Sequence, residues 1–345
     1  MVECHQRIEK GMVLIMSKKL LLTMACHQYD RVQALFDGTV QPEGIDLICI
    51  SNTGAETFFR MLRHKEFDMC EMSLSSYAAT LFSEDPAFIA IPAFPSRVMR
   101  HSCIWINKNS GIKEPKDFIG KRVGNPEWQM TATVWQRGFM QDDYGVPIDS
   151  VKYFTGGLID PGRVEKIAID LPPNIDLTPI PTDKTLQDML ENGEIDALYH
   201  AGIPPVYHTG KNVRRLFENY AEVEMEYYKR TRIFHIMHTF VIRRDLYEKH
   251  PWIAQTMMKA LNESKKIAME QMYDSGGLKY TLPWLVDHIE KTRELMGKDY
   301  WAYGLEPNRH VLETFLRYSY EQSLSKRLLK PEELFAPNSL ESWKH

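Results

Sequence analysis

The sequence predicts an α/β protein built of two lobes. Three observations support this: strand-like and helical segments alternate through the first hundred residues, the alternation begins again near Ile112, and only helices follow a last strand at 233–242. Alternating strands and helices indicate mainly parallel sheets that are covered by helices on both faces. A return strand before the closing helices implies that the chain crosses between the lobes twice.

The first lobe begins with a buried strand and continues with strand–helix pairs. Ile45 to Ile50 follows the turn Pro42-Glu43-Gly44 and is typical of a strand. Apolar residues then recur at helical spacing before the next strand. The expected strands are 20–24, 45–50, 67–72, 88–94 and 103–106, and the expected helices are 55–62 and 73–82.

The second lobe starts with a short helix at Pro115, a turn and a new strand that reaches Gly124. Apolar spacing predicts its helices and, after the return strand, the closing helices of the chain. The expected helices are 130–143 and 186–190, the expected strands are 151–154, 177–180 and 195–199, and the closing helical periods begin near 253, 285 and 311.

This order of elements resembles the type II periplasmic-binding-protein fold. Residues 17–110 plus 235–345 form the first expected lobe and enclose the second, 111–234, while 1–16 is expected to be a poorly ordered extension with Met16 as an alternative start. In that fold the ligand lies in the cleft between the lobes, at strand ends and helix N-termini whose backbone N–H groups bind anions.

Composition excludes several classes of function. The chain has 345 residues, 42 Lys+Arg and 46 Asp+Glu, so its formal net charge is −4 without a basic tail for nucleic acid. No run approaches the ~20 apolar residues of a membrane span. The five cysteines form no C-x-x-C pair, which indicates a reducing compartment. With no export signal recognised, we expect a cytoplasmic protein.

Four polar segments follow predicted strands and are candidate ligand contacts: 29–31, 95–102, 124–132 and 227–238. Arg97, Arg100 and His101 follow a strand and suit a dianion, because a guanidinium binds a carboxylate through two parallel hydrogen bonds. Glu127 to Thr131 stands where a strand meets a helix. A solvated loop and an ordinary helix start are the respective alternatives.

We interpret the fourth segment as a strand. Alternation then places Arg230, Arg232 and His238 on one face and His235 on the other. The two histidines therefore have the wrong parity to bind one metal ion together. Neither a G-x-S-x-G nor an H-E-x-x-H motif is present, so nucleophilic catalysis and a zinc protease site have no support.

Several longer stretches carry recognisable motifs: YDR at 29–31, QPEGIDL at 41–47, FDMCEMSLSSY at 67–77, IPAFPSRVMRHS at 91–102, GKRVGNPEWQMTATVWQRG at 120–138, GGLIDPGR at 156–163, GEIDAL at 193–198, IFHIMHTFVIRRDLYEKHPW at 233–252, LMGKDYWAYGLEPNR at 295–309 and PEELFAP at 331–337. Taken together, these stretches resemble the 4,5-dihydroxyphthalate decarboxylase family over nearly everything after Met16. Two departures from the usual family pattern are His235, in place of Pro, and Trp128, in place of Tyr.

The resemblance implies a carboxy-lyase that converts 4,5-dihydroxyphthalate to 3,4-dihydroxybenzoate (protocatechuate) and CO2. The substrate's para hydroxyl is its own electron sink, so no organic cofactor is expected. We hypothesise that His101 or His238 donates the proton and that Glu127 orients or deprotonates the phenol. The expected substrate-binding residues are Arg31, Arg97 and Arg163, with Arg230 in reserve, and the hydrogen-bonding residues Ser73, Gln129 and Thr131.

Three alternatives stay open at this point. A solute-binding protein of an ABC transporter has the same fold, and fold does not determine function. A cofactor-biosynthesis enzyme, such as a dehydratase of menaquinone precursors, is the second. The third is decarboxylation assisted by a divalent metal that the catechol bridges, although no ligand spacing predicts a metal site. The family also implies a homo-oligomer.

Overall fold

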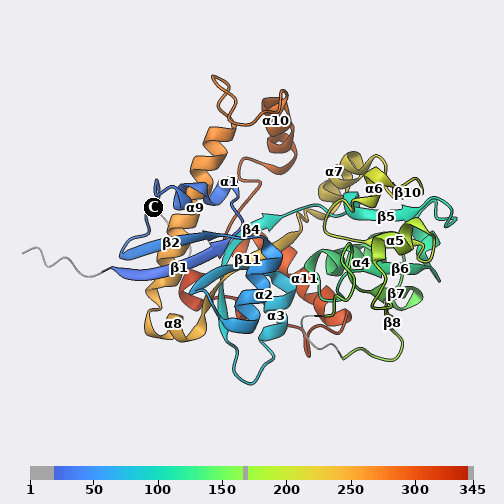
Figure 1. Cartoon of the computed structure of the whole chain (residues 1–345). Helices are drawn as coiled ribbons and strands as arrows, with labels where there is room; N and C mark the ends of the chain where they lie inside the picture. Colours follow the sequence, from blue (N-terminus) through green and yellow to red (C-terminus); the bar gives the residue numbers. More distant parts are fainter. Residues whose placement is uncertain (1–18, 166–169, 341–345) are drawn as a thin grey trace, which may run out of the picture.

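Two mixed β-sheets, each with its own helices, make up the protein (Figure 1). The computed structural model describes residues 19–165 and 170–340. The prediction of a two-lobed α/β fold is confirmed. The extension expected over 1–16 lies outside the described residues.

The first sheet has the strand order β2-β1-β3-β11-β4. β1 is parallel to β2 and β3, whereas β11 is antiparallel to β3 and β4, so the last strand returns from the other lobe as expected. Its strands are β1 (Leu20–Cys26), β2 (Ile45–Ser51), β3 (Met69–Ser73), β4 (Phe88–Arg97) and β11 (Ile236–Arg243).

Seven helices belong to the chain segments around this sheet within the described residues. The start of α2 has a local cause: its N-cap residue is Thr53, whose hydroxyl accepts a hydrogen bond from the Glu56 amide. They are α1 (Asp30–Phe36), α2 (Gly54–His64), α3 (Leu74–Thr80), α8 (Arg244–Lys249), α9 (Trp252–Met272), α10 (Leu285–Met296) and α11 (Arg309–Glu321).

The second sheet has the strand order β10-β5-β9-β6-β7-β8, and β6, β7, β8 and β9 are mutually parallel. Its strands are β5 (Ile104–Asn107), β6 (Arg122–Asn125), β7 (Lys152–Thr155), β8 (Asp176–Pro179), β9 (Ala197–Tyr199) and β10 (Val213–Arg215). Its helices are α4 (Thr131–Tyr144), α5 (Leu186–Glu191), α6 (Val206–Thr209) and α7 (Tyr220–Thr231).

The chain passes between the sheets at two places, 98–103 and 232–235. The sequence predicts that the second lobe begins at residue 111. In the structure β5 already pairs with β9 and β10, so the second sheet begins with β5, before that boundary. β5 is a short apolar run like its predecessor β4, so its pattern does not show which sheet it joins. Among the helices of the described part of the chain, none combines the length and apolarity needed to cross a membrane.

The C-terminal segment connects the two halves of the molecule. α11 lies against α4, and the ring of Tyr318 occupies the space beside Gly138. Gln322, just after α11, accepts a hydrogen bond from Arg137 Nε at 2.8 Å and from Trp128 Nε1 at 3.0 Å. Further on, the Ala336 amide donates to the Ala90 carbonyl of β4 at 2.8 Å.

Candidate active site

The carboxyl ends of the parallel strands of both sheets meet at the boundary between the lobes. Ser73, at the end of β3, places its Oγ 2.8 Å from Oγ1 of Thr131, the first residue of α4. The Thr131 hydroxyl also accepts a hydrogen bond from the Ser75 amide at 3.1 Å. In open α/β sheets, ligands bind outside the carboxyl ends of the strands, so this boundary is the candidate site.

On the side of the site that the first sheet contributes, the buried carboxylate of Glu71 is hydrogen-bonded to three surrounding groups. Glu71 Oε1 lies 2.5 Å from His238 Nδ1 and accepts a hydrogen bond from the Tyr29 hydroxyl at 2.6 Å. The His27 amide donates to Oε2 at 3.0 Å. The Glu71 side chain is fully buried, whereas that of His238 is 21% exposed.

The sheet register explains why Glu71 and His238 meet. Ser73 lies opposite His238 and Glu71 lies opposite Phe240 in the antiparallel pair β3–β11. Glu71 and His238 are therefore diagonal neighbours on one face, within reach of long side chains. Phe58 of α2 packs edge-on against the imidazole, with ring centroids 4.9 Å apart.

The ionisation of Glu71 reflects two opposing effects. Burial alone raises the pKa of this carboxyl group, but His238, the Tyr29 hydroxyl and the His27 amide together hold its pKa below the ordinary value. Burial and the adjacent carboxylate raise the pKa of the Tyr29 phenol. Glu71 is thus a carboxylate, and Tyr29 is its neutral hydrogen-bond donor.

Arg31 lies on the same side, in the first turn of α1. Its guanidinium carbon is 4.1 Å from the ring centroid of Tyr29 and 4.3 Å from that of Trp301. It also donates to the Pro95 carbonyl and, at 2.9 Å, to Asp30 Oδ1. The guanidinium is therefore held in a fixed plane between two aromatic rings, an arrangement that favours planar recognition of a carboxylate.

Arg97, which the sequence predicts to bind substrate, is the last residue of β4 and is deeply buried. Only 6% of it is exposed, it donates to Asn308 Oδ1, and its guanidinium lies over Phe94 and Phe234. Burial lowers the pKa of Arg97 to about 10. The structure thus gives Arg97 a packing role at the end of the strand, beside the residues that hold Arg31.

The second lobe contributes an ion pair between Glu127 and Arg163. Two guanidinium nitrogens of Arg163 donate to Glu127 Oε1; the Glu127 side chain is 2% exposed and that of Arg163 is 36% exposed. Gln129, in the same loop, is also buried. Burial raises the pKa of nearby Glu165 to about 7, although the Trp128 amide that donates to it acts in the opposite direction.

A pocket of about 360 Å³ lies beside this ion pair. It is lined by residues 157–163, which follow β7, and by His200, which follows β9. His200 Nδ1 lies 3.0 Å from both the carbonyl oxygen and the amide of Gly202, and burial lowers the pKa of this imidazole to about 4. The pocket is at the carboxyl ends of the strands, where the fold predicts a ligand.

His101 does not belong to this site, contrary to the prediction. It is fully buried and stacks on Phe139 with ring centroids 4.2 Å apart, near Tyr227 and His235. Neither of its ring nitrogens has a hydrogen-bond partner among the described residues. Burial, reinforced by the charge of Arg230, lowers the pKa of His101 to about 3. It is a neutral aromatic core residue.

Arg230 is also outside the site. The segment predicted as a strand from residue 227 is instead the end of helix α7, and Arg232 takes a left-handed conformation, φ 57°, that ends the helix. Helical geometry points Arg230 to the surface, where it forms an ion pair with Asp143. The face that was inferred from strand alternation therefore does not exist before β11.

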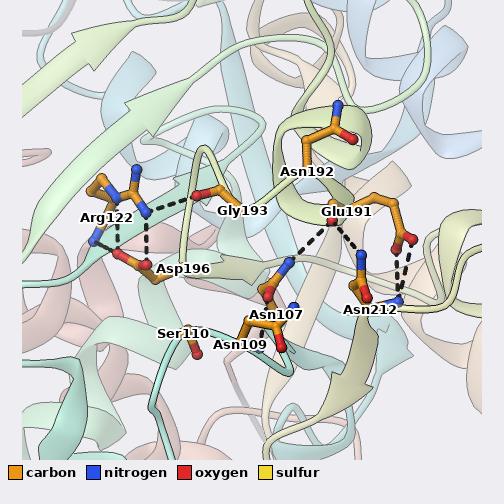
Figure 2. Close-up of a pocket in the computed structure, with 9 residues that line it drawn as sticks. All are labelled: Asn107, Asn109, Ser110, Arg122, Glu191, Asn192, Gly193, Asp196 and Asn212. Carbon is orange, nitrogen blue, oxygen red and sulfur yellow. Dashed lines mark hydrogen bonds and ion pairs between the residues drawn. The ribbon is translucent and has the colours of Figure 1, made fainter.

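A larger pocket of about 470 Å³ lies at the other end of the second sheet. Figure 2 shows that the polar groups of this pocket are mostly hydrogen-bonded to one another. Arg122 donates to the Asp196 carboxylate and to the Gly193 carbonyl. The side-chain amides of Asn107 and Asn212 donate to the Glu191 carbonyl, and the Asn212 backbone amide donates to the Glu191 carboxylate. Arg122 and Asp196 stand where β6 and β9 begin. This edge is opposite to the one where the parallel strands end, so we place the site elsewhere.

Sequence reasoning missed Glu71, Glu165, His200 and Trp301. For Glu71 a signal was present, since an acidic residue inside a buried apolar strand is rarely tolerated unless it is paired. The pattern offers no such signal for Trp301, which reaches Arg31 only through the tertiary fold. Within 19–165 and 170–340, no cluster of three or more His, Cys, Asp or Glu residues has the arrangement of a metal site.

Fold and site together define a two-lobed α/β protein of the type II periplasmic-binding-protein-like class. Among solved structures, the chain is similar to SsuA, a periplasmic sulfonate-binding protein of an ABC transporter from Methylobacillus flagellatus KT, with a TM-score of 0.50. The two are 14% identical, and the match covers 93% of each chain. This likeness concerns the fold alone. No protein-family model matches the chain.

Two curated relatives show the family. A protein from Comamonas testosteroni, named 4,5-dihydroxyphthalate decarboxylase, is 41% identical over 327 residues, which are 94% of this chain and 99% of the relative. A protein of the same name from Pseudomonas putida is 40% identical over 196 residues, or 57% of this chain and 76% of the relative. The chain belongs to the 4,5-dihydroxyphthalate decarboxylase family, as its motifs predict.

Proposed function

We propose that the protein removes CO2 from a hydroxylated aromatic dicarboxylate, with 4,5-dihydroxyphthalate as substrate and 3,4-dihydroxybenzoate as product. Membership of the family supports the reaction and the substrate. The structural observation that carries the proposal is the His238 imidazole, which the buried Glu71 carboxylate orients at the edge where the two sheets meet.

The substrate's own hydroxyl groups make the reaction possible without an organic cofactor. Each carboxylate of 4,5-dihydroxyphthalate is para to a hydroxyl group. A proton adds to the ring carbon that bears the carboxylate, while the para hydroxyl loses its proton and becomes a carbonyl. The C–CO2 bond then breaks, its electron pair restores the aromatic ring, and the oxygen regains a proton. Overall, one proton replaces one CO2.

The residues at the boundary suit the separate parts of this reaction. Of the two candidate proton donors, His101 and His238, we propose His238, because its Nδ1 is bound to Glu71 and its ring is partly exposed. Arg31 and Arg163 supply positive charge for the two carboxylates from opposite lobes. Glu127, paired with Arg163, orients or deprotonates the phenol. Ser73, Thr131 and Gln129 add hydrogen-bonding groups along the same edge.

Incubation of the purified protein with 4,5-dihydroxyphthalate tests the proposal. We expect CO2 release and an ultraviolet spectrum that changes to that of 3,4-dihydroxybenzoate. A parallel incubation with chelator, followed by addition of Mg²⁺ or Mn²⁺, determines whether a substrate-bridged metal takes part. Tight binding of aromatic diacids without turnover of any of them contradicts the proposal and favours a solute-binding protein instead.

A further inference from the structure

Glu71 is the acidic residue whose placement most needs an explanation. It is fully buried in the central part of the first sheet, between Cys70 and Met72, and it has no Arg or Lys among its hydrogen-bond partners in the described residues. An isolated ionised carboxylate in such a place is strongly unfavourable. Its partners are His238, the Tyr29 hydroxyl and the His27 amide, and each of them is oriented by this one carboxylate.

The contact with His238 determines which ring nitrogen faces the site. A carboxylate can only accept a hydrogen bond, so Nδ1 must carry a proton when it lies 2.5 Å from Glu71 Oε1. Nε2 is then the nitrogen that exchanges protons with a ligand. The carboxylate also stabilises the imidazolium that exists whenever Nε2 is protonated as well.

Tyr29 adjusts the same carboxylate from the loop after β1. Its hydroxyl donates to Oε1 at 2.6 Å, the same oxygen that faces His238. Ser96 of β4 hydrogen-bonds the phenol in turn, and the Arg31 guanidinium lies over its ring. The titratable and polar groups around the Glu71–His238 pair are thus the thiols of Cys26 and Cys70, Tyr29 and the His27 amide in the loop after β1, Arg31 of α1 and Ser96 of β4, with Phe58 of α2 against the imidazole.

We propose that Glu71 is the positioning residue of the decarboxylase, with Tyr29 as its tuning partner: the buried carboxylate fixes the Nδ1–H tautomer of His238 and stabilises the imidazolium that protonates the substrate ring. This inference rests on the proposed function. Glu71 does not itself touch the substrate in this proposal. It acts from β3 on His238 of the adjacent strand β11.

Glu71→Gln is the main test because it keeps the shape of the side chain and removes its charge. We expect kcat to fall at least about tenfold while KM changes less than about twofold, since the loss concerns proton transfer rather than binding. The rate profile of the variant should move toward lower pH, because the imidazolium has lost its counter-charge. Asp196→Asn, which breaks an ion pair at the far edge of the second sheet, is the matched control and should leave the profile unchanged.

Tyr29→Phe provides a second variant if Glu71→Gln does not fold. Removing one hydrogen bond to Oε1 leaves the carboxylate stronger as an acceptor from His238. We expect the rate profile to move toward higher pH, opposite to Glu71→Gln, with about a threefold change in kcat. Shifts in the same direction for both variants contradict a role that works through the charge of Glu71.

Proton and ¹⁵N NMR of the full chain separates this inference from the proposed function. The wild-type protein should show a far-downfield Nδ1 proton on His238 that moves upfield in Glu71→Gln and disappears in His238→Gln. If the protein shows this signal but no decarboxylation, the proposed function fails while the tautomer assignment stands. If the protein is active and Glu71→Gln keeps both its rate profile and its Nδ1 resonance, the positioning role is wrong.

Discussion

The hydroxyl oxygens of Ser73 and Thr131 lie 2.8 Å apart and join the end of β3 to the first turn of α4. Each hydroxyl belongs to a different sheet's set of strands and helices, so the pair is a direct contact between the lobes at the site. Both residues were expected from the sequence to bind substrate. The structure gives them this additional mutual contact.

The effects of Ser73→Ala and Thr131→Ala on the free energy of unfolding and on kcat/KM should be non-additive. Each substitution leaves the other hydroxyl without this partner, at a cost of about 1 kcal/mol, and the double variant should lose less than the sum. A double-mutant cycle of urea unfolding, with kcat/KM measured on the same four proteins, checks this. Additive losses in both measurements would show that the contact does not couple the lobes.

His238→Gln should lower kcat by about 10² or more, because the proposed general acid is lost. His101→Gln should act differently, since it places an amide among aromatic rings far from the site. We expect it to lower the unfolding midpoint and to leave kcat per folded molecule close to that of the wild type. Steady-state kinetics normalised to the folded fraction distinguishes the two histidines.

Acid should destabilise the protein through His101 and His235. Burial lowers the pKa of His101 to about 3 and holds that of His235 well below 6.5. Above about pH 6.5 these groups are neutral in both states and contribute nothing. Below about pH 6.5 the unfolded chain binds protons that the folded protein does not. For each of these histidines, the free energy of unfolding therefore decreases by about 1.4 kcal/mol for every unit by which the pH falls.

His101→Phe isolates this contribution because it keeps a ring on Phe139. Glu165, whose pKa is raised from 4.5 to about 7, acts in the opposite sense between those two values, so the comparison with wild type is the informative quantity. Urea unfolding from pH 7 to pH 4.5 gives the free energy of unfolding as a function of pH. In the variant this free energy should depend less steeply on pH, by the amount that one bound proton contributes. An unchanged slope would mean that His101 is protonated in the folded protein.

Arg31→Gln should raise KM for the diacid about tenfold or more, because one charge-assisted contact is removed. Arg230→Gln is the matched control, since Arg230 pairs with Asp143 at the surface. We expect its KM to stay within about twofold of wild type. Equal effects of the two substitutions would contradict the position of the site.

Gly138→Ala should destabilise the protein by about 1–3 kcal/mol. A Cβ at this position would lie 2.2 Å from the Tyr318 ring, so α4 and α11 could not keep their separation. Tyr318→Leu in the Gly138→Ala background should recover part of the loss. Thermal unfolding of the three proteins measures both effects.

The order of elements could be predicted because apolar spacing records burial. Strand and helix periods identified most elements of both sheets, and the family motifs placed Ser73, Glu127 and His238 beside strand or helix ends. The strand prediction for residues 227–232 is wrong, since this run of two aromatic and three basic residues has no apolar period that separates an exposed helix from a strand edge. Its true geometry moves Arg230 away from the site.

The roles of His101 and Glu71 depended on tertiary structure. His101 stands in a polar motif, PSRVMRHS, but the short turn after it directs the ring inward onto Phe139. Glu71 stands in an apolar strand whose pattern predicts only burial. Its partners come from residues 27–29 and 238, and pairing across that separation becomes visible only through the register of β3 and β11.

Gln322 has a mechanical consequence for the whole molecule. Solute receptors of two lobes close on their ligand by rotation about the crossings of the chain. Here the residues after α11 bond Arg137 and Trp128 of one half and then the β4 backbone of the other. We expect this third connection to restrict such a rotation. Discrimination between substrates should then depend largely on a shape that exists before the ligand arrives.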